Sequence, residues 1–123
     1  MFPFFKTRLD SFRCAWNGIS YVFRTETNMK IHLAIAIFVV AVGFVLHISL
    51  MEWGILALCI GLVLAAELFN TAIERFVDFV EPQRDARVGL IKDIAAGGVL
   101  LCAIAAAVVG FIVFLPKIIA LLA

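Results

Sequence analysis

Charged residues are scarce in this chain of 123 residues. Asp, Glu, Lys and Arg make up 15% of it, whereas 65% of the residues are hydrophobic and the mean hydropathy is +1.15. A soluble domain carries about 25% charged residues, so this composition excludes that class and indicates an integral membrane protein. Because the chain is too short for two membrane domains, we expect residues 1–123 to form a single all-α domain, completed by further copies of itself.

Cysteines and standard nucleotide-binding motifs are also lacking. The three cysteines, Cys14, Cys59 and Cys102, are odd in number and have no CxxC spacing, which argues against a disulfide framework and against a zinc site. We interpret them as small apolar residues. No GxxxxGK[ST], HRD, DFG or GxGxxG motif occurs, so no standard motif points to ATP. The net charge of +1 gives no indication of a nucleic-acid partner.

Long apolar segments predict three transmembrane helices, since about 20 apolar residues cross a hydrocarbon core roughly 30 Å thick. Residues 31–51 contain no Asp, Glu, Lys or Arg. A second helix is predicted over residues 53–80. The third is predicted over residues 94–115, where we expect Pro116 and Lys117 to end it.

Residues 4–23 show a different pattern, because their apolar side chains recur at alternating spacings of four and three. The stripe consists of Phe5, Leu9, Phe12, Trp16, Ile19 and Phe23. Charged and polar residues occupy the other side. This pattern predicts an amphipathic helix that lies on the membrane surface and does not cross the membrane.

The basic residues are distributed unevenly along the chain. Five precede the first predicted span, and four lie at the end of the second span or in its connection to the third. None lies between the first two spans, and only Lys117 follows the third. The positive-inside rule therefore predicts a cytoplasmic N-terminus, a cytoplasmic second connection and an external C-terminus.

Four polar side chains share one face of the second predicted span. Counted from Glu67 at about 100° per residue, the other three lie within roughly 60° of it: Asn70, Glu74 and Asp78. An ionised group at the centre of a membrane helix costs roughly 2.5 to 3.5 kcal/mol, so Glu67, about 16 Å along the axis from Asp78, needs a compensating partner. Desolvation there suits a carboxylate that takes a proton from a hydroxyl. The alternative is a set of solvated ion pairs, with Arg75 serving Glu74 or Asp78.

Further polar residues are predicted at the same membrane face. Glu26 precedes the first span, and Lys92 and Asp93 precede the third. Clustered carboxylates repel one another unless a cation joins them, and Mg²⁺ accepts oxygen ligands from one or two carboxylates plus substrate phosphates. Lys92 would then face a phosphate. The two histidines lie toward opposite ends of the first span, which argues against a two-His metal site, and we interpret His32 as an interfacial hydrogen-bonding residue.

Two series of small residues predict close helix packing. One comprises Gly54, Ala57, Gly61 and Ala65, and the other comprises Gly98, Cys102, Ala106 and Gly110. Such faces suit contact with copies of the same chain, although packing within one three-helix monomer would also use them.

The residues alone leave two functions open. One is an enzyme that acts on a lipid headgroup, and the other is a small proton- or cation-coupled transporter whose carboxylates relay ions. Ion flux into sealed vesicles without ATP would identify the transporter, whereas an ATP-dependent lipid phosphate would identify the enzyme.

A resemblance favours the enzyme. The stretch Glu-Leu-Phe-Asn-Thr-Ala-Ile-Glu-Arg-Phe-Val-Asp over residues 67–78, followed by Lys92-Asp93, resembles the signature of the prokaryotic diacylglycerol kinase and undecaprenol kinase family. The resemblance covers nearly the whole chain, including Trp16-Asn17-Gly18 and Glu26. It implies a homotrimer in the bacterial inner membrane that transfers the γ-phosphoryl group of ATP to a lipid alcohol, with active sites shared between neighbouring protomers.

The resemblance also implies roles for individual residues. Glu67 would be the general base toward the lipid hydroxyl, and Glu26 and Glu74 would bind Mg²⁺. The nucleotide would be bound by Asn70, Glu74, Asp78, Lys92 and Asp93, so Glu74 would contact both the metal and the nucleotide.

Some positions depart from the family pattern. Many members carry a Glu-Tyr-His-like sequence after the second span, whereas this chain has Gln83-Arg84-Asp85, which leaves open which of these residues contacts ATP. A basic residue near the start of the surface helix is common, but neither Lys6 nor Arg8 is in its register, so we assign neither. The segments 26–32, 51–53 and 114–117 resemble the undecaprenol kinase branch more closely. We therefore favour undecaprenol as the substrate, with diacylglycerol as the alternative.

Overall fold

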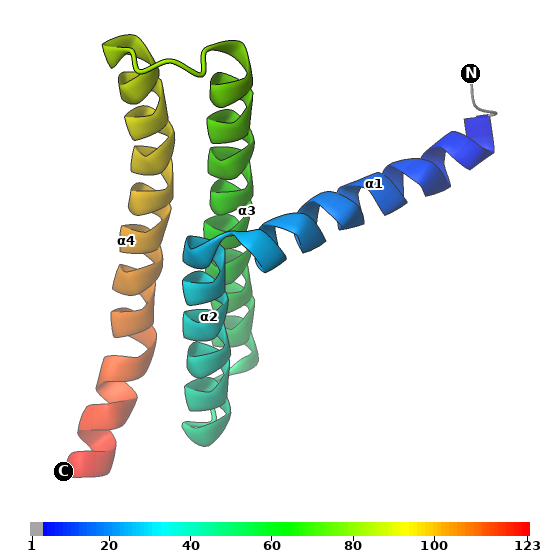
Figure 1. Ribbon diagram of the computed structural model, residues 1–123. Helices are drawn as coiled ribbons and strands as arrows, with labels where there is room; N and C mark the ends of the chain where they lie inside the picture. Colours follow the sequence, from blue (N-terminus) through cyan, green and yellow to red (C-terminus); the bar gives the residue numbers. More distant parts are fainter. Residues whose placement is uncertain (1–3) are drawn as a thin grey trace.

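The computed structural model describes residues 4–123, which form four helices without a β-strand (Figure 1). Their bounds are Phe4–Thr25 for α1, Thr27–Val45 for α2, Leu50–Val80 for α3 and Ala86–Leu122 for α4. The last three are long and apolar enough to span a membrane. The predicted all-α membrane fold is thus confirmed. Residues 1–3 of the predicted domain lie outside the described part, and so do the side chains of residues 4–6, among them Phe5 of the predicted apolar stripe and Lys6.

Helix α1 leaves the bundle sideways, whereas α2, α3 and α4 run alongside one another (Figure 1). The change of direction takes place at Glu26, whose extended backbone (φ −97°, ψ 119°) separates α1 from α2. Phe12 and Trp16 of α1 remain 81% and 67% exposed. An apolar stripe so exposed needs another apolar surface, which the membrane supplies.

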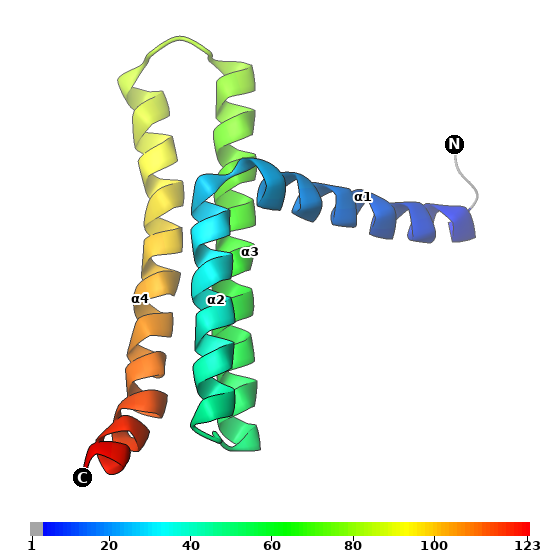
Figure 2. The same ribbon diagram turned by 60° about the horizontal axis from the view of Figure 1, so that its bottom comes forward.

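The hairpin of α3 and α4 extends well beyond the level at which α1 meets α2 (Figure 2). If α1 lies on the membrane surface, the last turns of α3 and the first turns of α4 lie outside the hydrocarbon core. The connection between them carries charged residues at the same end of the bundle as α1. The short connection between α2 and α3 and the C-terminus lie at the opposite end.

The opposite end of the bundle is held by packing and by an ion pair. Ile48, Leu56 and Val113 form a buried apolar cluster there. Ser49 and Glu52 form a reciprocal capping box that starts α3, and Lys117 of α4 contacts the Glu52 carboxylate at 3.2 Å. The cap satisfies two backbone N–H groups that would otherwise lack partners.

Helix α4 extends beyond the predicted span 94–115 in both directions. It begins at Ala86, because the Asp85 side chain accepts a hydrogen bond from the Arg87 backbone N–H and caps the first turn. It also continues through Pro116 to Leu122, so the predicted stop at Pro116 is wrong. Membrane helices tolerate proline, and the residues that follow Pro116 are apolar enough to remain helical.

Candidate functional site

Glu67 lies in the middle of α3 with only 3% of its surface exposed. Its nearest basic partner comes from another helix: Nε2 of His32 on α2 is 3.8 Å from its Oε2. Residues 63–71 of α3 contain no basic residue, so α3 itself offers Glu67 no such partner within one turn. The interpretation of His32 as an interfacial hydrogen-bonding residue did not include this contact, although a histidine at the start of the neighbouring predicted span was a signal for it.

Asn70 and Thr71 lie one turn further along α3 and are also buried. The Asn70 amide donates a hydrogen bond to Oε1 of Glu74 at 3.4 Å. The Asn70 carbonyl oxygen Oδ1 and the Thr71 hydroxyl have no hydrogen-bond partner. Buried polar atoms are rarely left unpaired, so these two atoms are candidates to bind a ligand.

Glu26, at the junction of α1 and α2, meets α3 through Arg75. Arg75 Nη2 is 2.5 Å from the Glu26 carboxylate, and its guanidinium lies 5.6 Å from the centre of the Tyr21 ring of α1. Arg75 therefore joins three helices. It pairs with Glu26, and neither Glu74 nor Asp78 forms the ion pair with it that the solvated alternative predicts.

The predicted inner carboxylates gather at this junction. Glu26 and Glu74 are both close enough to Glu67 to interact with it electrostatically. Within residues 4–123, however, no group of three or more His, Cys, Asp or Glu side chains is placed as a ready-made metal site. What the junction offers is two carboxylates and the unpaired amide oxygen of Asn70. These hard oxygen donors fit Mg²⁺, which commonly keeps waters and takes its remaining ligands from phosphates.

The remaining predicted residues lie further out, on the part of the hairpin beyond α1. Lys92 Nζ of α4 is 2.5 Å from the Asp78 carboxylate of α3, which fixes the two helices together. Asp93 is exposed and has no hydrogen-bond or ion-pair partner in the described part of the chain. The predicted set is thus divided into two groups. The inner group consists of Glu67, Asn70, Glu74 and Glu26, and the outer group consists of Asp78, Lys92 and Asp93.

A polar cavity of about 450 Å³ lies beside the outer group. It is lined by Asp78, Lys92 and the connection that contains Gln83, Arg84 and Asp85. Hydrogen bonds from the side chain and backbone of Arg87 hold the pKa of Asp85 below its ordinary value, so this carboxylate stays ionised. Although Gln83, Arg84 and Asp85 differ from the Glu-Tyr-His pattern, the cavity that they line is polar and charged.

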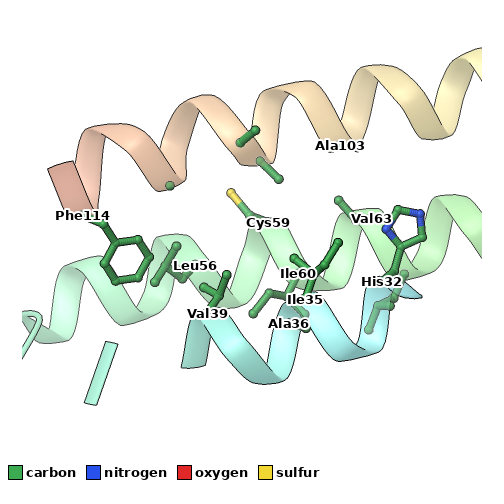
Figure 3. Close-up of a pocket in the computed structure, with 14 residues that line it drawn as sticks. His32, Ile35, Ala36, Val39, Leu56, Cys59, Ile60, Val63, Ala103 and Phe114 are labelled. Atoms are coloured by element: carbon green, nitrogen blue, oxygen red, sulfur yellow. The ribbon is translucent and has the colours of Figure 1, made fainter. Parts of the chain in front are cut away.

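An apolar cavity of about 290 Å³ lies on the membrane side of Glu67, between α2, α3 and α4. Figure 3 shows the His32 imidazole at one end and the Phe114 ring at the other. Small residues form part of its wall, among them Ala106 and Gly110 of the second predicted series. That series therefore borders a cavity within one chain, rather than only a contact between copies.

The family described as prokaryotic diacylglycerol kinase matches residues 13–114. A diacylglycerol kinase of Synechocystis sp. is 43% identical over 115 residues, which cover 93% of this chain and 66% of the relative. An undecaprenol kinase of Bacillus subtilis is 40% identical over 107 residues, which cover 87% of each chain. A diacylglycerol kinase of Helicobacter pylori is 28% identical over 92 residues, which cover 75% of this chain and 66% of that protein.

Proposed function

The chain belongs to the prokaryotic diacylglycerol kinase family, a family of lipid kinases, and we propose that it transfers the γ-phosphoryl group of ATP to the hydroxyl of a membrane lipid. The observation that carries this proposal is the position of Glu67. This carboxylate is 3% exposed, and along α3 it lies between Val63 and Leu64, which line the apolar cavity, and Asp78, which lines the polar cavity. A lipid alcohol and a nucleotide approach such a site from opposite directions.

Glu67 is the general base of this proposal. The lipid hydroxyl gives its proton to the Glu67 carboxylate as its oxygen attacks the γ-phosphorus, and ADP leaves. Phosphoryl transfer requires mainly alignment of the two reactants and neutralisation of charge, so one base and several fixed polar groups suffice. The absence of a standard phosphate loop is therefore no objection.

Glu26 and Glu74 are the proposed magnesium ligands, and the unpaired carbonyl oxygen belongs to Asn70, whose amide is hydrogen-bonded to Glu74. When bound, Mg²⁺ supplies neutralisation of the β- and γ-phosphate charges. The two carboxylates come from different helices, so their relative position depends on the Arg75 contact that holds the start of α2 against α3.

The outer group is proposed to hold the nucleotide. Lys92 supplies the positive charge toward the phosphates, while Asp78 and Asp93 contribute hydrogen-bond acceptors nearby. The cavity beside them has the size of a small-molecule pocket, for which about 300 to 1,000 Å³ is typical. Its wall of Gln83, Arg84 and Asp85 replaces the family's more common sequence at this position.

Undecaprenol is the proposed substrate, and diacylglycerol is the alternative. The relatives include enzymes with each name at 43% and 40% identity, so overall identity does not separate the two substrates. The segments 26–32, 51–53 and 114–117 support undecaprenol. Purified protein should be given both lipids with ATP and Mg²⁺, and turnover of diacylglycerol alone would reverse the preference.

The proposed location is the bacterial inner membrane, with the N-terminus in the cytoplasm, where ATP is available. The concentration of basic residues at the end of the bundle that carries α1 supports this orientation. We further propose a homotrimer in which neighbouring protomers complete each site. The exposed, unpartnered Asp93 and the uncovered small residues of α3 support this assembly.

Glu67→Gln tests the proposal, because it keeps the size of the side chain and removes the base. We expect ATP-dependent formation of radiolabelled lipid, measured by thin-layer chromatography, to fall by at least about a hundredfold. Glu52→Gln is the matched control, since it makes the same change on the same helix at the opposite end of the bundle. Wild-type turnover by Glu67→Gln would remove Glu67 from the mechanism, and ion flux without ATP would instead support a transporter.

A further inference from the structure

His32 and Glu67 are separated by a distance that suits a bridging atom. Nε2 of His32 and Oε2 of Glu67 are 3.8 Å apart, which is too long for a hydrogen bond between them. An oxygen to one side of the line that joins them can lie about 2.8 Å from both atoms at once. A hydroxyl is suited to this position, because it can donate its hydrogen to the carboxylate and accept one from the imidazole at the same time.

The apolar cavity determines from which side such a hydroxyl arrives. His32 is the ring at the Glu67 end of that cavity, which is otherwise lined by apolar side chains and Cys59 (Figure 3). Val63 and Leu64 of its wall lie one helical turn before Glu67 on α3. A hydroxyl at the end of an apolar chain can therefore meet His32 and Glu67 together while the chain occupies the cavity.

His32 is also restrained where it stands. Its side chain is 20% exposed, and the Glu67 side chain is 4% exposed, so neither group is free to turn toward bulk water. Met29, one turn earlier on α2, is completely buried and fixes this part of the helix. The separation of 3.8 Å is thus set by the packing of α2 against α3.

We propose that His32 is a second ligand of the lipid hydroxyl, which holds the hydroxyl oxygen while Glu67 accepts its proton. The inference rests on the proposed function. His32 donates its Nε2–H to the hydroxyl oxygen and keeps that proton throughout. The hydroxyl proton passes to Glu67, the oxygen forms its bond to the γ-phosphorus, and the bond from that phosphorus to the bridging oxygen of ADP breaks.

This role predicts an effect on the lipid and none on the nucleotide. His32→Leu removes the donor but keeps apolar bulk, and we expect kcat/KM for the lipid to fall about 10- to 100-fold. The KM for ATP should stay within about twofold, because the nucleotide is assigned to the outer group. His32→Gln restores an N–H at a similar reach and should recover most of the loss.

The control is Ile37→Val, a small apolar change at an exposed position of the same helix that does not line the cavity. It should leave kcat/KM for the lipid within a few-fold of wild type. If His32→Leu does not assemble, His32→Gln is compared with His32→Asn, whose shorter amide should not reach the hydroxyl and should be at least about tenfold less active. We expect thermal unfolding of each variant to show that the differences in activity do not follow differences in stability.

The inference is overturned if His32→Leu keeps the wild-type kcat/KM for the lipid. It is overturned if the KM for ATP rises by as large a factor as kcat/KM for the lipid falls. It is overturned as well if His32→Gln is as inactive as His32→Leu. It is also overturned if His32→Asn equals His32→Gln. These results are distinguishable from failure of the proposed function. An inactive Glu67→Gln with an unaffected His32→Leu removes only the role of His32, whereas an active Glu67→Gln removes the base itself.

Discussion

Burial decreases along the polar face of α3 toward its water-facing end. Glu67 and Asn70 are buried, Glu74 is half-buried, and Asp78 is exposed. A buried carboxylate is poorly solvated and therefore reactive toward a proton, whereas exposed charged groups can exchange water for a charged ligand at lower cost. The gradient thus matches a base at the inner end and nucleotide contacts at the outer end.

The proposed magnesium ligands lead to a prediction about metal dependence. For Glu26→Gln and Glu74→Gln we expect the Mg²⁺ concentration that gives half-maximal activity to rise at least about tenfold, because each change removes an anionic oxygen ligand. A Mg²⁺ titration of lipid phosphorylation at fixed ATP measures this. Glu52→Gln should titrate like the wild type. An unchanged metal requirement in both variants would contradict the assignment, and additional Mg²⁺ should not rescue Glu67→Gln.

How far the sequence predicts this site differs from residue to residue. The shared face of Glu67, Asn70, Glu74 and Asp78 followed from helical periodicity alone, because all four lie on one continuous helix. The contact of His32 with Glu67 depends on how α2 is rotated against α3. Residues 31–51 are apolar on all sides, so no stripe indicates which side of that segment faces the neighbouring helix.

The helix ends illustrate a second limit of prediction. Hydropathy located the apolar centre of α4 but missed its start, since the polar first turn depends on the cap by Asp85 rather than on apolar composition. It also misjudged Pro116, because proline stops helices in water more strictly than in apolar surroundings. The length of α4 matters for the proposed nucleotide site, because its additional turns carry Lys92 and border the polar cavity.

The packing of α2 against the start of α3 leaves too little space for a larger residue at Gly43, which leads to a testable prediction. A Cβ at this position would lie 2.7 Å from Cη2 of Trp53 and 3.1 Å from Cδ1 of Ile48. The Trp53 ring packs against Phe44, with ring centres 4.8 Å apart, and has little room to move. We expect Gly43→Ala to destabilise the protein by about 1 kcal/mol, because the clash outweighs the better helix propensity of alanine.

Thermal unfolding in detergent, followed by circular dichroism, measures this effect. Gly98→Ala on α4 is the control, because no atom of the described chain lies within 4 Å of a Cβ there, and it should be neutral or slightly stabilising. A Gly43→Ala protein that unfolds at or above the wild-type temperature would show that Trp53 can move aside.

The molecule as a whole exposes apolar side chains around all three long helices, while its charges collect toward the ends. Helix α1 indicates the level of the membrane surface (Figure 1). The contacts of Glu67 with His32 and of Arg75 with Glu26 place this part of α3 near the start of α2, where α1 joins the bundle. A reaction between a lipid and a water-soluble nucleotide requires this position. A site deeper in the bilayer would exclude ATP, and one further out would be beyond the reach of the lipid hydroxyl.

The first series of small residues leads to a prediction about assembly. Gly54, Ala57 and Gly61 are exposed, and a Cβ at Gly54 or Gly61 would meet no atom of the described chain within 4 Å. Small exposed residues along one membrane helix allow the backbone of another helix to approach closely. We expect Gly61→Leu to prevent this approach and to shift the purified protein from the proposed trimer to smaller species, with loss of activity because the proposed site needs residues of neighbouring protomers.

Light scattering coupled to size-exclusion chromatography in detergent measures the protein mass. Ala105→Leu is the matched control, since it adds a large side chain at an exposed position of α4 outside both series of small residues. That variant should assemble and remain active, because an exposed leucine there only faces lipid. A Gly61→Leu protein with wild-type mass would exclude this face of α3 from the interface, and an active monomer would show that one chain holds the complete site.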